Sequence, residues 1–364
     1  MNVNKEEVLK ALSTVIDPDL NNDLVSLGMI RNLDVGEKKI SFDVNLTTPA
    51  CPLKEVLRKE CDQAVRKLTG DEYEIDINLT ATVTTSQANL DLLKNVKNTI
   101  AIASGKGGVG KSTVTANLAV ALAKMGAKVG LIDADVYGPS MPTMFNCEDA
   151  QPGIKQVDGK NLIIPVEQYG VKIISIGFLA PAESAIIWRG PMASSALKQF
   201  IGDAEWGELD YLLFDLPPGT SDIHLTLVQT IPLTGAVIVT TPQKVALVDA
   251  TKGLAMFRQE KINVPVLGLI ENMAYFTPEE LPDNKYYIFG KEGGKILAEK
   301  QNVPFLGEVP LVQSVREGGD KGYPVALDEG PMADSFKSIA EKLAQQIAIR
   351  NASDIKTKVV EFNT

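Results

Sequence analysis

The pattern of apolar and polar residues in the first 90 residues differs from the pattern in the rest of the chain. Residues 40–46 and 74–79 alternate apolar and polar side chains with a period of two, which is typical of half-buried strands. Residues 4–15 and 52–68 instead have apolar side chains at helical spacing. Together these segments predict a small α+β domain over residues 1–90.

Strand-like and helix-like segments alternate along the rest of the chain. This alternation over residues 98–348 predicts a mostly parallel sheet that is covered by helices on both faces. Polar residues 91–97 form a linker before it, and polar residues 349–364 are expected to be a loosely held tail. The predicted fold class is therefore α/β, preceded by the small α+β domain. The predicted strands of the sheet are 99–103, 128–132, 171–175, 211–214, 236–239 and 266–270.

A glycine-rich run follows the first of these strands and has the spacing of a phosphate-binding loop. A glycine, four further residues and Gly-Lys-Ser occupy residues 105–112, and a helical stretch follows at 113–124. Glycines let successive backbone N–H groups point at phosphate oxygens, and the N-terminus of the next helix adds partial positive charge. Lys111 would neutralise the β- and γ-phosphates, and Ser112 would ligate Mg²⁺. The run therefore predicts a P-loop NTPase fold that binds ATP and Mg²⁺.

Acidic residues at the ends of two later strands complete the predicted site. Asp133 and Asp135 follow strand 128–132, and Asp215 follows strand 211–214 and precedes Pro-Pro-Gly. Ligands bind at the C-terminal edge of parallel sheets, where these carboxylates would emerge. Asp215 would reach Mg²⁺ through its water shell, and the Pro-Pro-Gly turn would form a switch that senses the γ-phosphate. Helix capping by Asp133 and Asp135 is the alternative interpretation.

Composition and charge narrow the range of partners and compartments. There are 46 acidic and 36 basic residues, a net charge of −10, and no Lys/Arg-rich block, so no nucleic-acid partner is expected. No apolar run approaches the ~18 residues of a membrane helix, and the polar N-terminus does not have the pattern of a signal peptide. Three scattered cysteines fit a reducing cytoplasm. His224, the one histidine, is more typical of a packed or capping residue than of a catalytic one.

The nine residues 105–113, Gly-Lys-Gly-Gly-Val-Gly-Lys-Ser-Thr, resemble the deviant Walker A loop of the superfamily that contains MinD, ParA and the nitrogenase iron protein. In that superfamily the early lysine, here Lys106, reaches across a dimer interface to the partner's nucleotide. The resemblance therefore implies a homodimer that closes around ATP. It also implies catalytic roles for Lys106, Lys111 and Asp135, of which Asp135 would orient the attacking water.

The same resemblance implies a complete set of ligands for the nucleotide and the metal. Asn272 matches the asparagine that recognises adenine, although a turn-forming asparagine would fit its place at a strand end equally well. Asp133 matches an acidic residue closer to the metal. The residues expected at Mg²⁺ are Ser112, Asp133 and Asp215, the aspartates through water. Those expected at ATP are Gly105, Lys106, Gly107, Gly108, Val109, Gly110, Lys111, Ser112, Thr113 and Asn272.

Further motifs resemble one branch of this superfamily, the Mrp/ApbC branch, whose members bind and pass on iron–sulfur clusters. Within residues 1–90, three stretches resemble the small domain of iron–sulfur assembly factors that often precedes these ATPases. The resemblance implies a slow, switch-type ATP hydrolase that delivers clusters to apo-proteins. The matching stretches are 17–20, 23–28 and 47–52 in the small domain and 176–179, 188–192, 216–227, 241–243 and 305–310 in the larger one.

One part of the branch's pattern is missing. A Cys-x-x-Cys usually follows the Glu-Asn-Met of residues 271–273, and two such pairs would bridge a [4Fe–4S] cluster between subunits. The corresponding positions fall near Pro278 and Leu281, which are not ligands. Cys61 and Cys147 have the spacing and surroundings of buried hydrophobic residues.

Cys51 is the remaining candidate ligand of an iron–sulfur cluster. It precedes Pro52 at the start of a predicted helix, whose dipole would lower the pKa of the thiol and favour the thiolate. Two such thiolates in a dimer could share a [4Fe–4S] cluster with external thiols. A buried structural cysteine is an equally good interpretation. The alternatives for the whole chain are therefore a MinD/ParA-like ATP-dependent scaffold without a cluster, or a nucleotide sensor that does not hydrolyse ATP.

Overall fold

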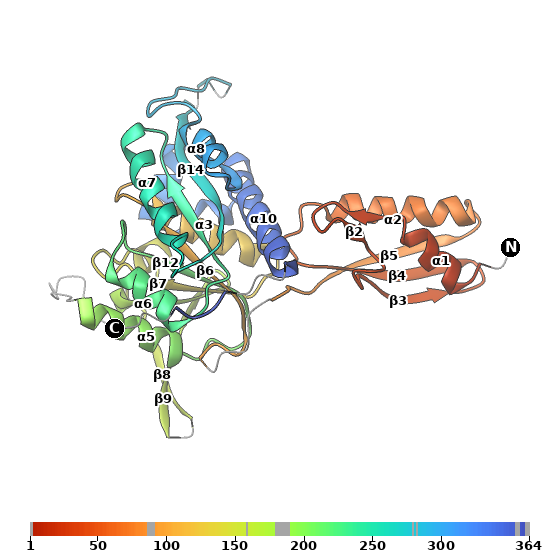
Figure 1. Ribbon diagram of the computed structural model, residues 1–364, viewed down its shortest axis with the longest axis horizontal. Helices are drawn as coiled ribbons and strands as arrows, with labels where there is room; N and C mark the ends of the chain where they lie inside the picture. The colour runs from red at the N-terminus through yellow and green to blue at the C-terminus, as the bar shows by residue number, and fades with distance from the viewer. Residues whose placement is uncertain are drawn as a thin grey trace.

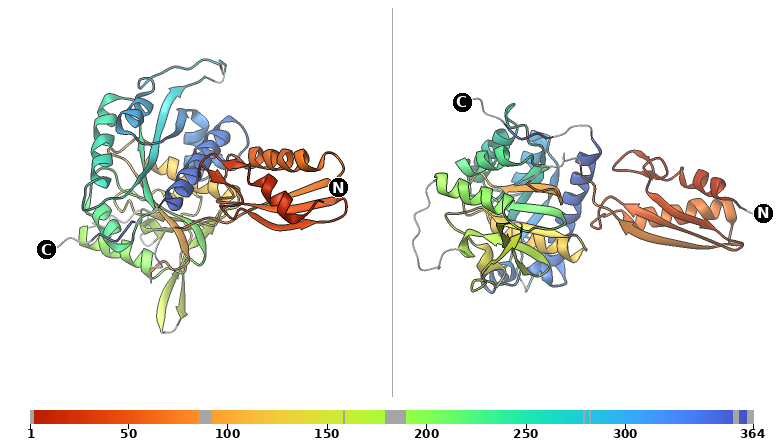
Figure 2. Two further views of the ribbon diagram at one scale, coloured as in Figure 1. Left: turned by 45° about the vertical axis from the view of Figure 1, so that its right-hand side comes forward. Right: turned by 90° about the horizontal axis from the view of Figure 1, so that it is seen from below.

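The protein has two domains that meet at one end of the smaller one. Figure 1 shows the small N-terminal domain projecting from the larger domain, and the two further views in Figure 2 agree. Within the described residues, no helix has both the length and the apolar character needed to cross a membrane. The computed structural model describes residues 3–85, 92–157, 159–178, 190–278, 280–281, 283–353 and 357–360.

The small domain packs two helices on a three-stranded sheet. Strand β4 lies in the middle, antiparallel to β3 and parallel to β5, and a two-residue pair, β1 and β2, lies apart from this sheet. The helices α1 and α2 bury Leu12, Leu57 and Cys61 against the sheet. The elements are α1 (Lys5–Leu12), β1 (Ile16–Asp17), β2 (Asn22–Asp23), β3 (Ile30–Val35), β4 (Lys39–Leu46), α2 (Lys54–Thr69) and β5 (Glu74–Ala81).

Both predicted helices and the strands β4 and β5 are confirmed, whereas β3 was not predicted. The register of β3 against β4 shifts between Arg31 and Asp34, and Asn32 adopts φ +52°. This irregularity breaks the alternation of apolar and polar side chains by which strands are recognised.

The larger domain is built on one eight-stranded sheet with the order β10-β11-β7-β12-β6-β13-β14-β15. All neighbours in it are parallel except β10 and β11, which are antiparallel. The predicted α/β class is therefore confirmed. The strands are β6 (Val96–Ala103), β7 (Val129–Asp133), β10 (Val166–Gln168), β11 (Val171–Ser175), β12 (Leu209–Asp215), β13 (Gly235–Thr240), β14 (Val266–Phe276) and β15 (Phe305–Leu311).

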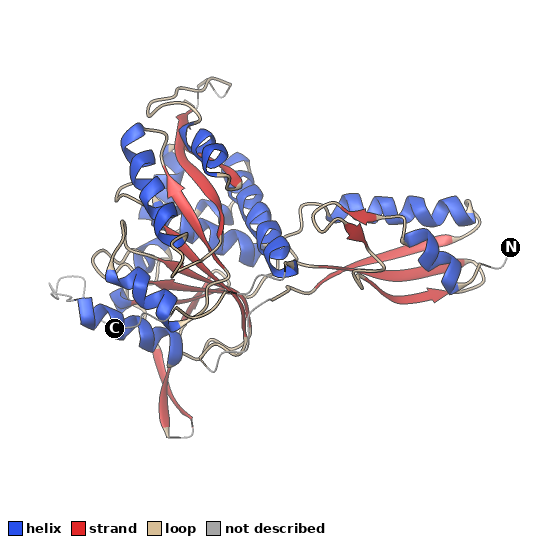
Figure 3. Cartoon of the chain, viewed as in Figure 1, coloured by secondary structure: helices blue, strands red, loops and turns tan. Residues whose placement is uncertain are grey.

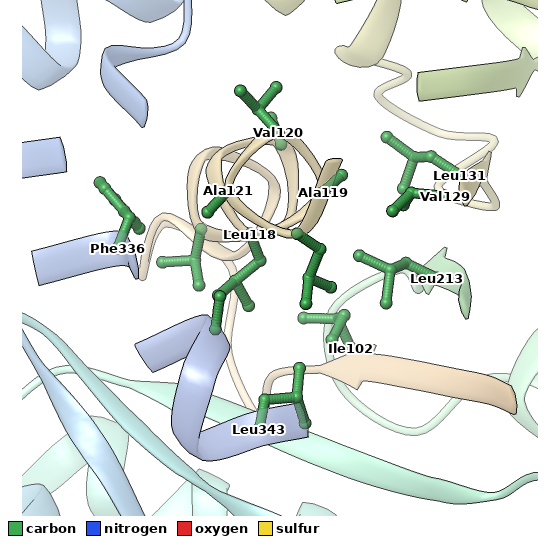
Figure 4. Packing of buried hydrophobic residues seen from close by; sticks show 14 of the residues in the cluster. Ile102, Leu118, Ala119, Val120, Ala121, Val129, Leu131, Leu213, Phe336 and Leu343 are labelled. Atoms are coloured by element: carbon green, nitrogen blue, oxygen red, sulfur yellow. The ribbon is translucent and has the colours of Figure 1, made fainter. Parts of the chain in front are cut away.

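Helices cover both faces of this sheet (Figure 3). On one face α3 (Lys111–Lys124) packs against α10 (Pro331–Ala352), and Figure 4 looks along α3 with Phe336 and Leu343 of α10 beside it. The other face is covered by α5, α6, α7 and α8. The remaining elements are α4 (Met141–Met144), β8 (Gly153–Val157), β9 (Lys160–Ile164), η1 (Ile176–Phe178), α5 (Gly190–Gly202), α6 (Asp222–Thr230), α7 (Lys244–Phe257), α8 (Gly293–Gln301), α9 (Gln313–Asp320) and η2 (Val325–Leu327).

The chain beyond the predicted boundaries is more ordered than the sequence indicates. Strand β6 begins at Val96, inside the predicted linker, and α10 continues to Ala352, past the predicted end at 348. In the polar tail, Val360 is buried against the larger domain and its N–H donates to the Val228 carbonyl at 3.0 Å. The prediction of a loosely held tail is therefore wrong for the described residues 357–360, because a single apolar side chain anchors an otherwise polar stretch.

Candidate nucleotide-binding site

The loop between β6 and α3 is confined by two neighbouring elements, and this explains two of its glycines. A Cβ added at Gly105 would lie 2.1 Å from the backbone carbonyl of Asp249 in α7. Gly110 has φ +76°, and a Cβ there would lie 2.2 Å from Nδ2 of Asn272. Glycine at these two positions therefore lets the loop backbone lie close to Asp249 and Asn272. The loop ends at the N-terminus of α3, where the free backbone N–H groups of a helix and its dipole favour an anion.

A charged cluster lies at the start of α3, directly beneath the loop. The Lys111 ammonium is 2.8 Å from Oδ2 of Asp215, and both side chains are buried. The Ser112 hydroxyl donates to the same oxygen at 2.6 Å. Thr115, one turn along α3, donates to Oδ1 of Asp215 at 2.7 Å. The predicted loop lysine, loop serine and strand-end aspartate therefore converge on one point.

Asp133 lies beside Asp215 because the strands β7 and β12 pair in register at these two residues. Its Oδ2 accepts hydrogen bonds from the Ser175 hydroxyl at 2.9 Å and from the backbone N–H groups of Ser140 and Met141 at 3.1 and 3.2 Å. Burial, together with the nearby charge of Asp215, raises the pKa of Asp133 to about 7. Asp133 thus holds the backbone that follows β7 and adds a second carboxyl to the site.

Asp135 lies two residues farther on, half-buried at the same edge of the sheet. Burial raises the pKa of Asp135, while the Lys111 charge and hydrogen bonds from the backbone of Tyr137 and Gly138 lower it. The Lys111 charge therefore acts on this carboxyl as well as on Asp215. An acidic group in this place is suited to accept a hydrogen bond from water near a bound phosphate.

The Pro-Pro-Gly turn after β12 lies against the phosphate loop. The Gly219 N–H donates to the Ser104 carbonyl at 2.8 Å, and Pro218 comes within ordinary van der Waals contact of a Cβ built at Gly107. A movement of the loop would therefore displace the predicted switch.

Lys106, in contrast to Lys111, is exposed. Its side chain is thus accessible to a partner molecule.

Asn272 is held beneath the loop. Its side-chain amide donates to the Val109 carbonyl at 2.8 Å, and the residue is buried. The neighbouring Glu271 accepts a hydrogen bond from the backbone N–H of Gly294 at the start of α8. In this structure the Asn272 amide therefore supports the loop backbone, and its role toward adenine stays a prediction.

Two positions in the site were missed by the sequence analysis. Thr115 and Ser175 are fully buried and hydrogen-bond the predicted carboxylates. Thr115 lies one helical turn after Lys111, which is a signal the spacing could have supplied. Ser175 ends strand β11, and only the register of β11 with β7 brings it to Asp133. Nothing in the local sequence around Ser175 indicates that pairing.

The Cys51 thiol does not have the low pKa that its position in the sequence predicts. Burial raises the pKa of Cys51, and the negative charges of Asp17, Asp19 and Glu341 raise it further. A hydrogen bond from the Leu53 N–H, at the start of α2, lowers it but does not offset the burial. The prediction that the helix terminus favours the thiolate is therefore wrong for this state of the protein.

The other two cysteines are buried as predicted. Burial raises the pKa of Cys61 to about 12 and that of Cys147 to about 11, so both thiols stay protonated at neutral pH. Leu281, near the missing Cys-x-x-Cys, is 49% exposed. Across the described part of the chain, no group of three or more His, Cys, Asp or Glu side chains is arranged to hold a metal ion.

His224 is a buried residue in the first turn of α6, as its sequence context indicates. The Ser221 N–H donates to its Nδ1 at 3.2 Å, and Nε2 has no hydrogen-bond partner among the described residues. Burial lowers the pKa of His224 to about 4. The imidazole is therefore neutral at physiological pH.

This lowered pKa predicts a specific sensitivity to acid. An unfolded histidine takes up a proton as the pH falls through about 6.5, whereas folded His224 does so only near pH 4. Between these values protonation favours the unfolded chain, so His224 should cost about 3 kcal/mol of stability at pH 4. The variant H224Q keeps a side-chain acceptor at the third helical position. Urea unfolding at pH 7 and pH 4.5 should show a smaller acid destabilisation in H224Q, and equal losses would contradict the assignment.

Comparison with known proteins agrees with this geometry. A family model described as NUBPL iron-transfer P-loop NTPase matches residues 95–344, and one described as iron-sulfur cluster assembly protein matches residues 5–77. The iron-sulfur cluster carrier protein of Synechocystis sp. is 46% identical over 348 residues, which are 94% of this chain and 98% of that protein. Its counterpart in Deinococcus radiodurans is 46% identical over 96% of this chain and 97% of that protein.

A solved structure shares the architecture of the larger domain. The nucleotide-binding protein of Archaeoglobus fulgidus in complex with ADP is 38% identical, with a TM-score of 0.57. The match covers 66% of this chain and 95% of that one. The family model alone spans more than half of the residues, and the relatives extend the likeness over nearly the whole sequence. The chain therefore belongs to the NUBPL iron-transfer P-loop NTPase family.

Proposed function

We propose that this protein is a cytoplasmic, homodimeric, Mg²⁺-dependent ATPase that binds iron–sulfur clusters and passes them to apo-proteins. The observation that carries the ATPase part is the convergence of Lys111, Ser112 and Asp215 beneath the phosphate loop. The carrier part is supported by 46% identity to iron-sulfur cluster carrier proteins along both domains. The exposed Lys106 supports a dimer, because an unburied lysine in this loop can reach a neighbouring subunit.

The donor atoms beneath the loop fit Mg²⁺. Ser112 and Asp215 present hard oxygen ligands at one point, with Asp133 alongside, and Mg²⁺ prefers oxygen donors and retains several waters. Ser112 would ligate the ion directly, and the two aspartates would hold its water shell. When bound, Mg²⁺ supplies charge neutralisation on the phosphates.

The chain's own residues would do the remaining work on ATP. The N–H groups of the loop would bind the phosphate oxygens, and Lys111 would place a cation on the β- and γ-phosphates. Asp135 would orient the attacking water, and Lys106 of the partner subunit would stabilise the charge that develops on the γ-phosphate. We expect slow turnover, because the nucleotide here acts as a conformational switch.

The cluster would be bound by Cys51. One thiolate per chain cannot hold four irons, so two chains would share a [4Fe–4S] cluster and leave two irons to external thiols. Because burial raises the pKa of Cys51, the thiol must lose its proton when iron binds. A cluster held this way should be labile, which suits a protein that gives it away.

Anaerobic reconstitution with iron and sulfide tests this proposal. The wild-type protein should develop the visible absorbance of a cluster, and C51S should lose it while its ATP hydrolysis is unchanged. C61S is the matched control, because Cys61 is also buried in the small domain. If C51S still takes up a full cluster, then Cys61 or Cys147 must be a ligand and the assignment of Cys51 is wrong.

A second candidate function is favoured by the missing cysteines near Pro278 and Leu281. A MinD/ParA-like ATP-dependent scaffold would need the nucleotide site but no cluster. In that case the wild-type protein would hydrolyse ATP and take up no iron under the same anaerobic conditions. That result would overturn the carrier proposal in favour of the scaffold.

A further inference from the structure

A small cavity lies where the two domains meet, and Cys51 lines it. The small domain contributes Asp17, Asp19, Thr48 and Cys51 to its wall, and α10 of the larger domain contributes Gln345 and Ala348. The cavity has a volume of about 10 Å³, which is room for about one water molecule. Cys51 is only 8% exposed. The cavity between Cys51 and α10 therefore has no room for an iron–sulfur cluster at this thiol.

The loop that carries Cys51 is held by both domains. The Thr48 and Tyr211 hydroxyls form a buried hydrogen bond at 2.9 Å, and Tyr211 lies on β12. Ala50 packs into the hydrophobic core of the larger domain, whereas Cys51 packs into that of the small domain. The loop thus joins the two cores. Moving one domain away from the other would expose the residues in the middle of this loop.

A second polar contact joins the two domains at the wall of the cavity. The Gln345 amide donates to Oδ1 of Asp19 at 2.6 Å. This pair joins residues that are 326 positions apart in sequence, and the Thr48–Tyr211 pair joins residues that are 163 positions apart. One contact joins two hydroxyls and the other joins an amide to a carboxylate, so water can replace each bond when the domains separate. Neither contact by itself locks the domains together.

The arrangement of the domains agrees with a separable contact. Within the described residues, Figures 1 and 2 show the small domain meeting the larger one at the end near α10, with its far end free. Where the connecting chain leaves the small domain, the carbonyl of Thr84 accepts hydrogen bonds from Asn98 at 3.0 Å and from Asn351 at 2.9 Å. Contacts between domains that are confined to one end in this way permit relative motion.

We propose that the docking of the small domain on α10 and β12 is a gate that covers Cys51 and opens to expose it. In the docked state the thiol is closed to reagents and to iron. In the undocked state Thr48 and Asp19 leave Tyr211 and Gln345, and Cys51 becomes accessible at the surface of the small domain. What Cys51 then binds rests on the proposed function, whereas the gate itself does not.

Alkylation of the nucleotide-free protein by N-ethylmaleimide, followed cysteine by cysteine by mass spectrometry, tests the gate. The double variant Y211F/Q345A removes both hydrogen bonds and leaves the loop sequence intact. Cys51 should react at least about tenfold faster in it, because the loss of both hydrogen bonds between the domains favours the open state. Cys61, which lies in the core of the same small domain, should keep its rate.

The single variant Q345A leaves the buried Tyr211 in place, so it tests the gate even if Y211F/Q345A misfolds. Q346A is its matched control. Gln346 is the next residue of α10 and does not line the cavity. Q345A should accelerate Cys51 and Q346A should not. An unchanged Cys51 rate in Y211F/Q345A would overturn the gate, and so would a parallel rise at Cys61, which would indicate unfolding of the small domain. A failure to bind iron would leave these rates unaffected, so the two proposals fail independently.

Discussion

Replacing Lys111 by alanine is expected to weaken ATP binding by about tenfold to a hundredfold or more. The substitution removes the cation that would face the β- and γ-phosphates, and a charge-assisted contact of this kind is worth about 1.5–3 kcal/mol. It also leaves the fully buried Asp215 without the ammonium that lies 2.8 Å away. That uncompensated carboxylate should repel the phosphates. Isothermal titration calorimetry with ATP measures the effect.

The other lysine of the same loop provides the matched control. Lys106 is exposed, so K106A should bind ATP with an affinity close to that of the wild type while losing hydrolysis. Because removing one partner of a buried ion pair is destabilising, thermal unfolding of K111A should be recorded alongside. A folded K111A that binds ATP as well as the wild type would contradict the assignment of the loop.

Replacing Asp135 by alanine is expected to separate binding from hydrolysis. Binding should survive, because Lys111, Ser112 and the loop backbone are untouched. Hydrolysis should fall by about a hundredfold or more, since the group that would orient the attacking water is lost. Light scattering after size-exclusion chromatography in ATP should then report a persistent dimer.

D149A, which changes an exposed aspartate of the same domain, should behave as the wild type. An unaltered hydrolysis rate in D135A would remove Asp135 from the mechanism.

The arrangement of the candidate nucleotide site was largely predictable because its parts are local in sequence. The loop 105–112 carries its own strand and helix on either side, and Asp133 and Asp215 each end a buried strand. The position of one strand end beside another then follows from the parallel topology. Residues such as Ser175 could not be predicted, because they reach the site only through the order of strands in the sheet.

The properties of Cys51 depend on contacts that no local pattern contains. The sequence places it before a helix, and that proximity alone predicts a lowered pKa. It lines a cavity together with α10, which lies near the other end of the chain, and Tyr211 in β12 holds the same loop through Thr48. The same is true of Val360, which is an isolated apolar residue in sequence and a core residue in space. Packing between residues this far apart in sequence becomes visible only in the folded structure.

Transfer of a cluster to an apo-protein tests the central claim most directly. The protein, reconstituted anaerobically, would be mixed with the apo form of an enzyme that needs a [4Fe–4S] cluster, in the presence of an iron chelator that intercepts free iron. The account predicts that the wild-type protein restores the enzyme's activity and that identically treated C51S does not. If loaded wild-type protein restores no activity, or if C51S restores as much, the protein is not a carrier that works through Cys51.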